Sequence, residues 1–155
     1  GITIPDYDIC DWHDVIETDL TGVFFCLKYE IPAILSSGGG AIVNMSSGNG
    51  VVGLAGLAPY TAAKHGVVGL TQAAALEYSA QGVRINAVGP AFIHTPMISG
   101  LEANAAVQAM LVASHPIGRL GQPEEVAELV TWLASDKASF VTGGYYPVDG
   151  GYLAR

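Results

Sequence analysis

The sequence predicts an α/β fold, a doubly wound parallel sheet of which this chain carries about three strands with flanking helices. Two observations predict it. Stretches with apolar residues spaced by three and four, typical of amphipathic helices, alternate with short apolar runs typical of buried strands. Helices that alternate with buried strands form right-handed βαβ units and therefore a parallel sheet. The length of 155 residues suits about one domain.

The first half of the chain is predicted to form a helix, a strand and a second helix. The first helix starts in an acidic cluster, which suits a helix N-terminus, and ends near Ser36. A turn at 36–40 leads into a strand at 41–45 that suits burial on both faces. The second helix starts at Pro59, where a missing N–H costs nothing, and runs to about Ala80. The apolar stripe of the first helix consists of Val15, Ile16, Leu20, Val23, Phe24 and Leu27.

The second half is predicted to add two strands and one long helix. Gly82 ends the preceding helix, and residues 83–90 form a buried strand stopped by a Gly-Pro pair. Residues 91–122 are the least regular part, with a short helical pattern near 100–113, and we expect them to be the most mobile. A helix starts at Pro123, and the run YYPVDGG closes the chain as a third short strand.

The carboxyl ends of the three predicted strands define the place to look for a ligand. Open α/β sheets bind ligands beyond these ends. Here they fall at Ser46/Ser47, Gly89/Pro90 and Asp149/Gly150.

Composition excludes several classes of function. A formal net charge of −8 with only six Lys and Arg residues argues against a nucleic-acid surface. No apolar stretch approaches the roughly 18 residues of a membrane span, and no secretory signal is visible, so we expect a cytoplasmic protein that does not bind membranes. Cys10 and Cys26 lack a metal-site or disulfide pattern and are expected to be buried small hydrophobes. The four histidines show no metal-ligand spacing, so no metal site is expected.

Residues 48–53, GNGVVG, match the G-x-G-x-x-G pattern of a dinucleotide-binding loop. The rest of that motif is missing. A helix should open at the last glycine and aim its N-terminus at a pyrophosphate, but the predicted helix waits until Pro59. The next acid, Glu77, lies near the end of that helix, where it could not hold a ribose. We interpret the glycines as a flexible turn.

A different set of residues in the same stretch can carry chemistry. Tyr60 and Lys64 are one helical turn apart and share a face. An ammonium close to a phenol stabilises the phenolate and lowers a pKa that is ordinarily near 10, which makes the phenol a usable acid or base. Ser47, at the end of a strand, could bond the substrate oxygen. The alternatives are a surface Tyr packed on a Lys stem and a simple turn serine.

The joint spacing of these residues resembles the classical short-chain dehydrogenase/reductase family, in which a Ser stands 13 residues before Y-x-x-x-K. The segments WHDVIETDLTGVF, RINAVGPAFIHTPM and GRLGQPEEVAELVTWLASDKASFVTGGYYPVDGG resemble a helix, a strand with its cofactor loop, and the final helix and strand of that family. The resemblance implies a Rossmann-like fold and covers nearly the whole chain.

The resemblance implies roles for individual residues. Tyr60 would be the general acid/base, Lys64 would lower its pKa and bond the nicotinamide ribose, and Ser47 would orient the substrate carbonyl. Pro90, Ile93 and Thr95 would hold the nicotinamide end of NAD or NADP, which the sequence does not distinguish. Residues 96–115 would form a mobile lid over a small alcohol or ketone. Apolar residues of this region favour an apolar or cyclic substrate: Phe92, Met97, Ile98, Leu101, Met110 and Leu111.

The chain departs from the family pattern in two places. The cofactor fingerprint and the first strands would lie before residue 1, so residues 1–155 correspond to the C-terminal catalytic portion of one domain. Asp19 stands where the family usually has an Asn that takes part in a proton relay to the Lys. It is either a relay member or a solvated helix residue. The resemblance also implies a homo-oligomer, a dimer or tetramer, and the alternative to an enzyme is a truncated, non-catalytic module for oligomerisation.

Overall fold

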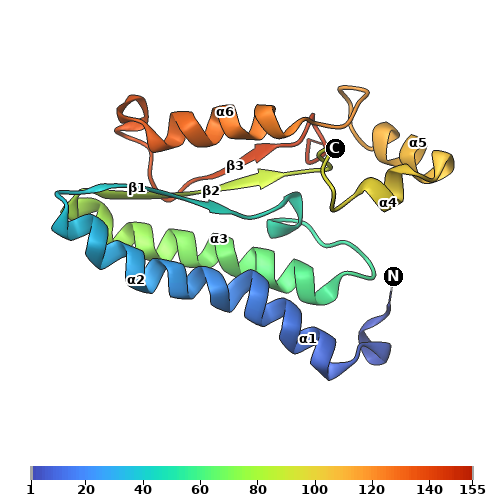
Figure 1. Ribbon diagram of the computed structural model, residues 1–155, viewed down its shortest axis with the longest axis horizontal. Helices are drawn as coiled ribbons and strands as arrows, with labels where there is room; N and C mark the ends of the chain where they lie inside the picture. The colour runs from blue at the N-terminus through green and yellow to red at the C-terminus, as the bar shows by residue number, and fades with distance from the viewer. Residues whose placement is uncertain (1, 155) are drawn as a thin grey trace.

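Parallel strands form the centre of the computed structural model, which describes residues 2–154. Within these residues the sheet has three strands, β1 (Gly40–Met45), β2 (Val83–Pro90) and β3 (Tyr145–Val148), in the order β1-β2-β3. Helices α2 (Gly22–Ser36) and α3 (Ala58–Tyr78) cover one face, and α6 (Pro123–Ala134) covers the other (Figure 1). The predicted α/β architecture with helices on both faces of a parallel sheet is therefore confirmed.

The predicted first helix is present, with an irregular centre. A short 3-10 turn at Ile4–Asp6 precedes α1 (Ile9–Ile16), and a π-helical stretch at Glu17–Thr21 joins α1 to α2. The Asp8 side chain caps α1 by accepting a hydrogen bond of 2.7 Å from the Cys10 N–H. This acceptor satisfies one of the N–H groups that a helix start leaves without a partner.

Helix α3 starts one residue before the predicted Pro59 and ends in a 3-10 turn at Ser79–Gln81. Gly82 follows with a φ of +86°, a left-handed conformation that glycine adopts without strain. The Gly82 carbonyl accepts a hydrogen bond of 3.0 Å from the Gly40 N–H at the start of β1. The end of α3 is thereby fixed beside the first strand of the sheet.

The region predicted to be irregular contains two short helices, α4 (Ser99–Glu102) and α5 (Ala105–Ala113). Asn104 caps α5, because its side-chain oxygen accepts from the N–H groups of Ala106 and Val107. At the start of α6, Gln122 and Glu125 form a reciprocal capping box. A 3-10 turn at Asp136–Ala138 then leads toward β3.

Two apolar clusters hold the layers together. Ile42, Val83 and Ile85 of the sheet pack with Leu27 and Ile31 of α2. On the opposite face the second cluster joins β2 and β3 to α6: Val88, Ile93, Val126 and Leu133, with Tyr146 and Val148 partly buried. The two faces are packed by alternate residues of the same strands, as a sheet between helices requires.

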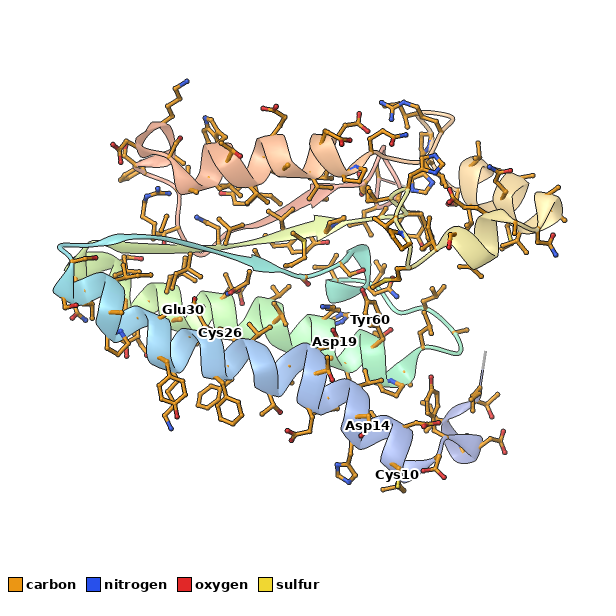
Figure 2. All side chains as sticks on the ribbon, in the orientation of Figure 1. Cys10, Asp14, Asp19, Cys26, Glu30 and Tyr60 are labelled. Atoms are coloured by element: carbon orange, nitrogen blue, oxygen red, sulfur yellow. The ribbon has the colours of Figure 1, made fainter. Side chains whose placement is uncertain are left out.

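Three predictions about the helical surface are wrong. Phe24, assigned to the buried stripe, is 46% exposed. Cys10 and Cys26 are free thiols and both are exposed (Figure 2). Phe25 and Tyr29 of α2 are exposed as well. Helical periodicity marks an apolar stripe without showing which part of it meets a neighbour.

Among residues 2–154, no helix is both long enough and apolar enough to cross a bilayer.

Candidate active site

A cavity of about 400 Å³ opens beside the carboxyl end of the sheet. Ser47, two residues beyond the end of β1, and Tyr60, in the first turn of α3, both line it. Phe92, from the loop after β2, and Ile98, at the start of α4, close other sides. The structure thus places the predicted serine and tyrosine in one cavity, of a size that suits a small ligand.

Lys64 lies one turn along α3 from Tyr60, with its Nζ 5.4 Å from the centroid of the tyrosine ring. The lysine is 8% exposed and does not line the cavity itself. Its Nζ donates to the Met45 carbonyl at 3.4 Å and lies 3.3 Å from Oδ1 of Asp19. A nearly buried ammonium needs such partners, because an unpaired charge is costly to remove from water.

Asp19 belongs to the π-helical stretch Glu17–Thr21, which packs against α3. Asp19 and Tyr60 (Figure 2) therefore come from neighbouring helical segments, and both lie near the Lys64 ammonium. The Asp19 side chain is 30% exposed. Asp19 is therefore partly exposed and in contact with Lys64. Its part in a proton relay stays a prediction.

The glycine-rich stretch after Ser47 folds as a short 3-10 helix, η3 (Gly48–Gly50). All three of its residues are buried. The stretch is a turn, as predicted, and its flexibility stays a prediction. A Cβ at Gly50 would meet the Ser46 hydroxyl and lie 3.1 Å from the Lys64 carbonyl, so Gly50 allows η3 to sit directly on α3. The Ser46 hydroxyl donates to that same carbonyl at 3.0 Å. Gly50 thus serves close packing.

The three residues at and after the end of β2 that were predicted to hold the nicotinamide do not share the cavity of Ser47 and Tyr60. Pro90 ends the strand, and the side chain of Ile93 is buried in the cluster against α6. The Thr95 carbonyl accepts a hydrogen bond of 3.1 Å from the Ile98 N–H. None of Pro90, Ile93 and Thr95 is among the residues that line the 400 Å³ cavity, whereas Ala91 and Phe92 are.

The predicted lid region contributes to the cavity only through its first part. Met97, Ile98 and Leu101 line it, as expected from their apolar character. Met110 is instead 63% exposed, and Leu111 is buried against Leu120 in a small cluster beneath the lid. These last two residues do not line the cavity, because α5 turns its buried side toward that cluster.

Three cavity residues carry polar groups that the sequence analysis missed: Tyr7, Asn49 and Tyr152. Tyr7 donates from its hydroxyl to the Gly56 carbonyl at 3.2 Å and so ties the N-terminal segment to the loop before α3. The rings of Tyr152 and Phe92 contact each other edge to face, with centroids 6.0 Å apart. No local motif marks these residues, since only the fold brings them to the cavity.

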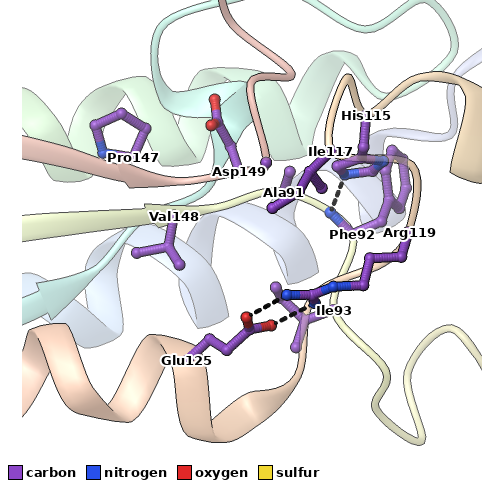
Figure 3. A pocket seen from close by; sticks show the side chains of 12 residues that line it. Ala91, Phe92, Ile93, His115, Ile117, Arg119, Glu125, Pro147, Val148 and Asp149 are labelled. Atoms are coloured by element: carbon purple, nitrogen blue, oxygen red, sulfur yellow. Dashed lines mark hydrogen bonds and ion pairs between the residues drawn. The ribbon is translucent and has the colours of Figure 1, made fainter.

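A second cavity, of about 320 Å³, lies behind the loop after β2 (Figure 3). On one side, His115 uses both ring nitrogens. Nδ1 lies 2.7 Å from the Leu111 carbonyl, and Nε2 accepts from the Phe92 N–H at 3.4 Å. Because the carbonyl can only accept and the N–H can only donate, these contacts require a neutral imidazole with its proton on Nδ1. His115 therefore buttresses the backbone of a residue that lines the first cavity.

On the other side of the second cavity, Arg119 forms a bidentate ion pair with Glu125, at 2.7 and 2.8 Å (Figure 3). The Arg119 hydrogen bonds, together with the N–H of Gln122, lower the pKa of Glu125 to about 2. The same pair raises the pKa of Arg119. The two charges satisfy each other and fix the start of α6.

Comparison with known proteins agrees with this geometry. A family model described as enoyl-(acyl carrier protein) reductase matches residues 2–153. The chain is 55% identical over 144 residues, 93% of its length, to cyclohexanol dehydrogenase from Acinetobacter sp. (strain SE19). It is 51% identical over 151 residues, 97% of its length, to cis-4-hydroxycyclohexanecarboxylate dehydrogenase from Sinomonas cyclohexanicum. The chain belongs to the short-chain dehydrogenase/reductase family.

A solved structure shows the same fold. Gluconate 5-dehydrogenase from Burkholderia cenocepacia J2315, in complex with NADP and tartrate, superimposes with a TM-score of 0.95 at 29% identity, over 100% of this chain and 62% of that one. The chain spans 55% and 60% of the lengths of the two curated relatives above. Short-chain dehydrogenases/reductases use NAD or NADP. Within residues 2–154, no group of three or more His, Cys, Asp or Glu side chains could hold a metal ion.

Proposed function

We propose that the protein carrying this chain is an NAD(P)-dependent oxidoreductase that interconverts a secondary alcohol and a ketone. The observation that carries the proposal is the cavity in which Ser47 and Tyr60 meet, with the Lys64 ammonium 5.4 Å from the tyrosine ring. Residues 1–155 are, in this proposal, the C-terminal catalytic portion of one domain. The identity to two dehydrogenases of cyclic alcohols supports the reaction class.

Tyr60, Lys64 and Ser47 have different roles in the proposed reaction. In ketone reduction, the Tyr60 hydroxyl gives its proton to the carbonyl oxygen, and in alcohol oxidation the phenolate takes it back. Lys64 favours that phenolate through its positive charge. The Ser47 hydroxyl accepts a hydrogen bond of 3.2 Å from the Asn49 N–H and keeps its own proton to donate to the substrate oxygen. The cofactor, when bound, supplies or accepts the hydride.

The residues present fit the nicotinamide end of such a cofactor. The two contacts of Lys64 leave a third N–H that can bond a ribose hydroxyl. Pro90 and Thr95 would flank the nicotinamide. The Ile93 side chain is buried, so only its backbone could take part. A cradle for the phosphates does not appear within residues 2–154, where the G-x-G-x-x-G stretch forms a packed turn.

The lining of the cavity favours an uncharged alicyclic substrate. No Asp, Glu, Lys, Arg or His is among the described residues that line it, and apolar side chains dominate: Val15, Leu54, Leu57, Ala91, Phe92, Met97, Ile98 and Leu101. A substrate carboxylate would lose its hydration there without gaining a counter-ion. We therefore expect cyclohexanol to be preferred over a hydroxycyclohexanecarboxylate, which distinguishes between the substrates named for the two relatives.

The test is a spectrophotometric assay of the full-length protein with NAD(H) and NADP(H). Cyclohexanol or cyclohexanone should change the absorbance of the reduced nicotinamide, and Tyr60→Phe should abolish that change. Tyr78→Phe, a matched substitution at the far end of α3, should have no effect. Activity retained in Tyr60→Phe would contradict the assigned role. A preference for the carboxylate-bearing alcohol would contradict the proposed substrate class.

We propose further that this chain takes part in a homo-oligomer, whether or not it is catalytic. The support is the uncovered surface of α2 and α3, where Phe25 is 47%, Tyr29 67% and Leu76 89% exposed. Exposed apolar surface of this kind often marks a protein interface. Light scattering should give a dimer or tetramer, and Phe25→Glu should shift it toward the monomer. A monomer at all concentrations would refute the proposal. The cytoplasmic location stays a prediction.

A further inference from the structure

Tyr145, the first residue of β3, makes a contact across the whole sheet. Its hydroxyl donates a hydrogen bond of 2.9 Å to the Ser47 carbonyl. These residues are 98 positions apart, and β2 lies between the strands that carry them. The tyrosine is therefore a direct link from the far edge strand to the residue that follows β1.

Gly89 makes this link possible. A Cβ at Gly89 would collide with the hydroxyl and ring carbons of Tyr145, so the phenol lies directly over β2 at that position. The φ of Gly89 is not positive, and any residue could adopt its backbone conformation. Gly89 matters because it has no side chain in the way of Tyr145, and not because of its backbone conformation. The Tyr145 ring occupies that space.

The acceptor of this hydrogen bond, the Ser47 carbonyl, belongs to a residue that lines the cavity. The Ser47 carbonyl also accepts a hydrogen bond of 2.8 Å from the Gly50 N–H, which closes the η3 turn. The Ser47 hydroxyl accepts from Asn49 in the same turn. The two contacts of the carbonyl therefore fix both the backbone of Ser47 and the turn that orients its side chain.

The donor keeps its proton over the working pH range. Burial, and next the negative charge of Asp149, raise the pKa of Tyr145 to about 12. A tyrosine that stays protonated stays a hydrogen-bond donor to a carbonyl.

We propose that Tyr145 is a positioning residue for the reaction. Its hydroxyl, laid across β2 at Gly89, holds the Ser47 backbone and through it the orientation of the Ser47 hydroxyl in the cavity. The inference rests on the proposed function, because it gives Tyr145 a task only where Ser47 bonds the substrate oxygen. The tyrosine acts through Ser47 and does not itself touch the substrate.

The test compares Tyr145→Phe with Tyr146→Phe in the full-length protein. Each substitution removes one hydroxyl and keeps the ring, but Tyr146 packs against the α6 cluster on the other face of the sheet. Tyr145→Phe should lower kcat about tenfold, the effect of about one lost hydrogen bond on an oriented group, and leave the KM for the cofactor unchanged. It should also speed amide hydrogen exchange at Asn49 and Gly50. Tyr146→Phe should change neither kcat nor the exchange rates at Asn49 and Gly50.

A double-mutant cycle separates positioning from general destabilisation. Because Tyr145 acts through Ser47, Tyr145→Phe should cause no further loss of kcat in a Ser47→Ala background. The same tenfold loss in that background would overturn the inference. Full activity of Tyr145→Phe beside an impaired Ser47→Ala variant would also overturn it and leave the proposed function intact. Full activity of Ser47→Ala would instead refute the proposed role of Ser47 itself.

Discussion

Asp19 shows how one side chain changes the electrostatics of this site. Its Oδ1 lies 3.3 Å from the Lys64 ammonium, which in turn lies 5.4 Å from the Tyr60 ring. The resemblance to the family leads one to expect an uncharged Asn at this position. A carboxylate there partly cancels the positive charge that acts on the tyrosine. The ion pair also gives the nearly buried lysine a partner.

We predict that Asp19→Asn moves the pH–rate profile of alcohol oxidation toward lower pH, because the ammonium then acts on the phenolate without compensation. Initial rates of the full-length protein across a pH series measure the shift. Asp14→Asn is the matched control, since Asp14 is exposed on the same helical segment (Figure 2). Superimposable profiles would remove Asp19 from the mechanism, and a shift to higher pH would contradict the direction argued here.

At the level of single residues, the sequence predicted which polar side chains lie close together better than which side chains are exposed. Ser47, Tyr60 and Lys64 were found by their spacing, because a strand end and one helical turn fix their relative positions locally. Tyr145 could not be found in this way, since its partner lies 98 residues away. The exposure of Cys10 was missed because composition says nothing about which side of a helix is covered.

Among the elements, the η3 turn between Ser47 and α3 is where a motif was deceptive. Gly48, Gly50 and Gly53 fit a phosphate-binding pattern in the sequence, but in the structure Gly50 and Gly53 are packed differently. A Cβ at Gly50 would meet the Ser46 hydroxyl and press on α3, whereas a Cβ at Gly53 would have no atom within 4 Å. The two positions therefore have different requirements.

We predict that Gly50→Ala destabilises the fold by about 1–3 kcal/mol, the usual effect of overpacking, and lowers kcat because η3 must move away from α3. Gly53→Ala should leave the stability unchanged or slightly raised. Chemical unfolding gives the free energies, and a turnover assay gives kcat. A larger effect at Gly53 than at Gly50 would contradict the packing argument and favour a ligand-binding loop.

The start of α6 carries a pH-dependent contact. The Arg119 hydrogen bonds lower the pKa of Glu125 from 4.5 to about 2. A carboxyl whose pKa is lower in the folded state contributes stability above its unfolded pKa, and that contribution is lost as the pH falls toward the folded value. The relevant window is therefore from about 4.5 down to about 2.

We predict that Glu125→Gln lowers Tm at neutral pH and that the difference from wild type shrinks as the pH falls through this window. Thermal unfolding followed by circular dichroism at a series of pH values measures the difference. Glu124→Gln, on the same exposed first turn of α6, should leave Tm nearly unchanged at each pH. A Tm difference for Glu125→Gln that stays constant down to the acid limit would contradict the assignment.

For the whole molecule, the parallel sheet explains which features were predictable and why Ser47 and Tyr60 lie in one cavity. The order β1-β2-β3 follows from alternating helices and strands, and it brings Ser47 and Tyr60 to one cavity at the carboxyl edge. The irregular region was harder, because helices as short as α4 and α5 depend on tertiary contacts more than on propensity. Met110 and Leu111 show this, since both lie in α5 and neither faces the cavity.

The distribution of cofactor contacts leads to a prediction for the isolated chain. In the proposed function, Tyr60, Lys64 and the loop after β2 provide groups for the nicotinamide end, whereas Gly48–Gly50 of the stretch that resembles a phosphate loop are buried in a packed turn. Charge-assisted hydrogen bonds to phosphates contribute about 1.5–3 kcal/mol each, so two missing bonds weaken binding at least about a hundredfold.

Calorimetric titration of residues 1–155 with NADPH and NADH, beside the full-length protein, measures this difference once circular dichroism has verified that the isolated chain is folded. We expect the chain alone to bind either dinucleotide at least about a hundredfold more weakly than the full-length protein does. Adenosine diphosphate ribose, which lacks the nicotinamide, should bind the chain alone no better than the dinucleotides. Micromolar binding by residues 1–155 would contradict the prediction, because the N–H groups of Asn49, Gly50 and Val51 in the glycine stretch already have partners within the fold.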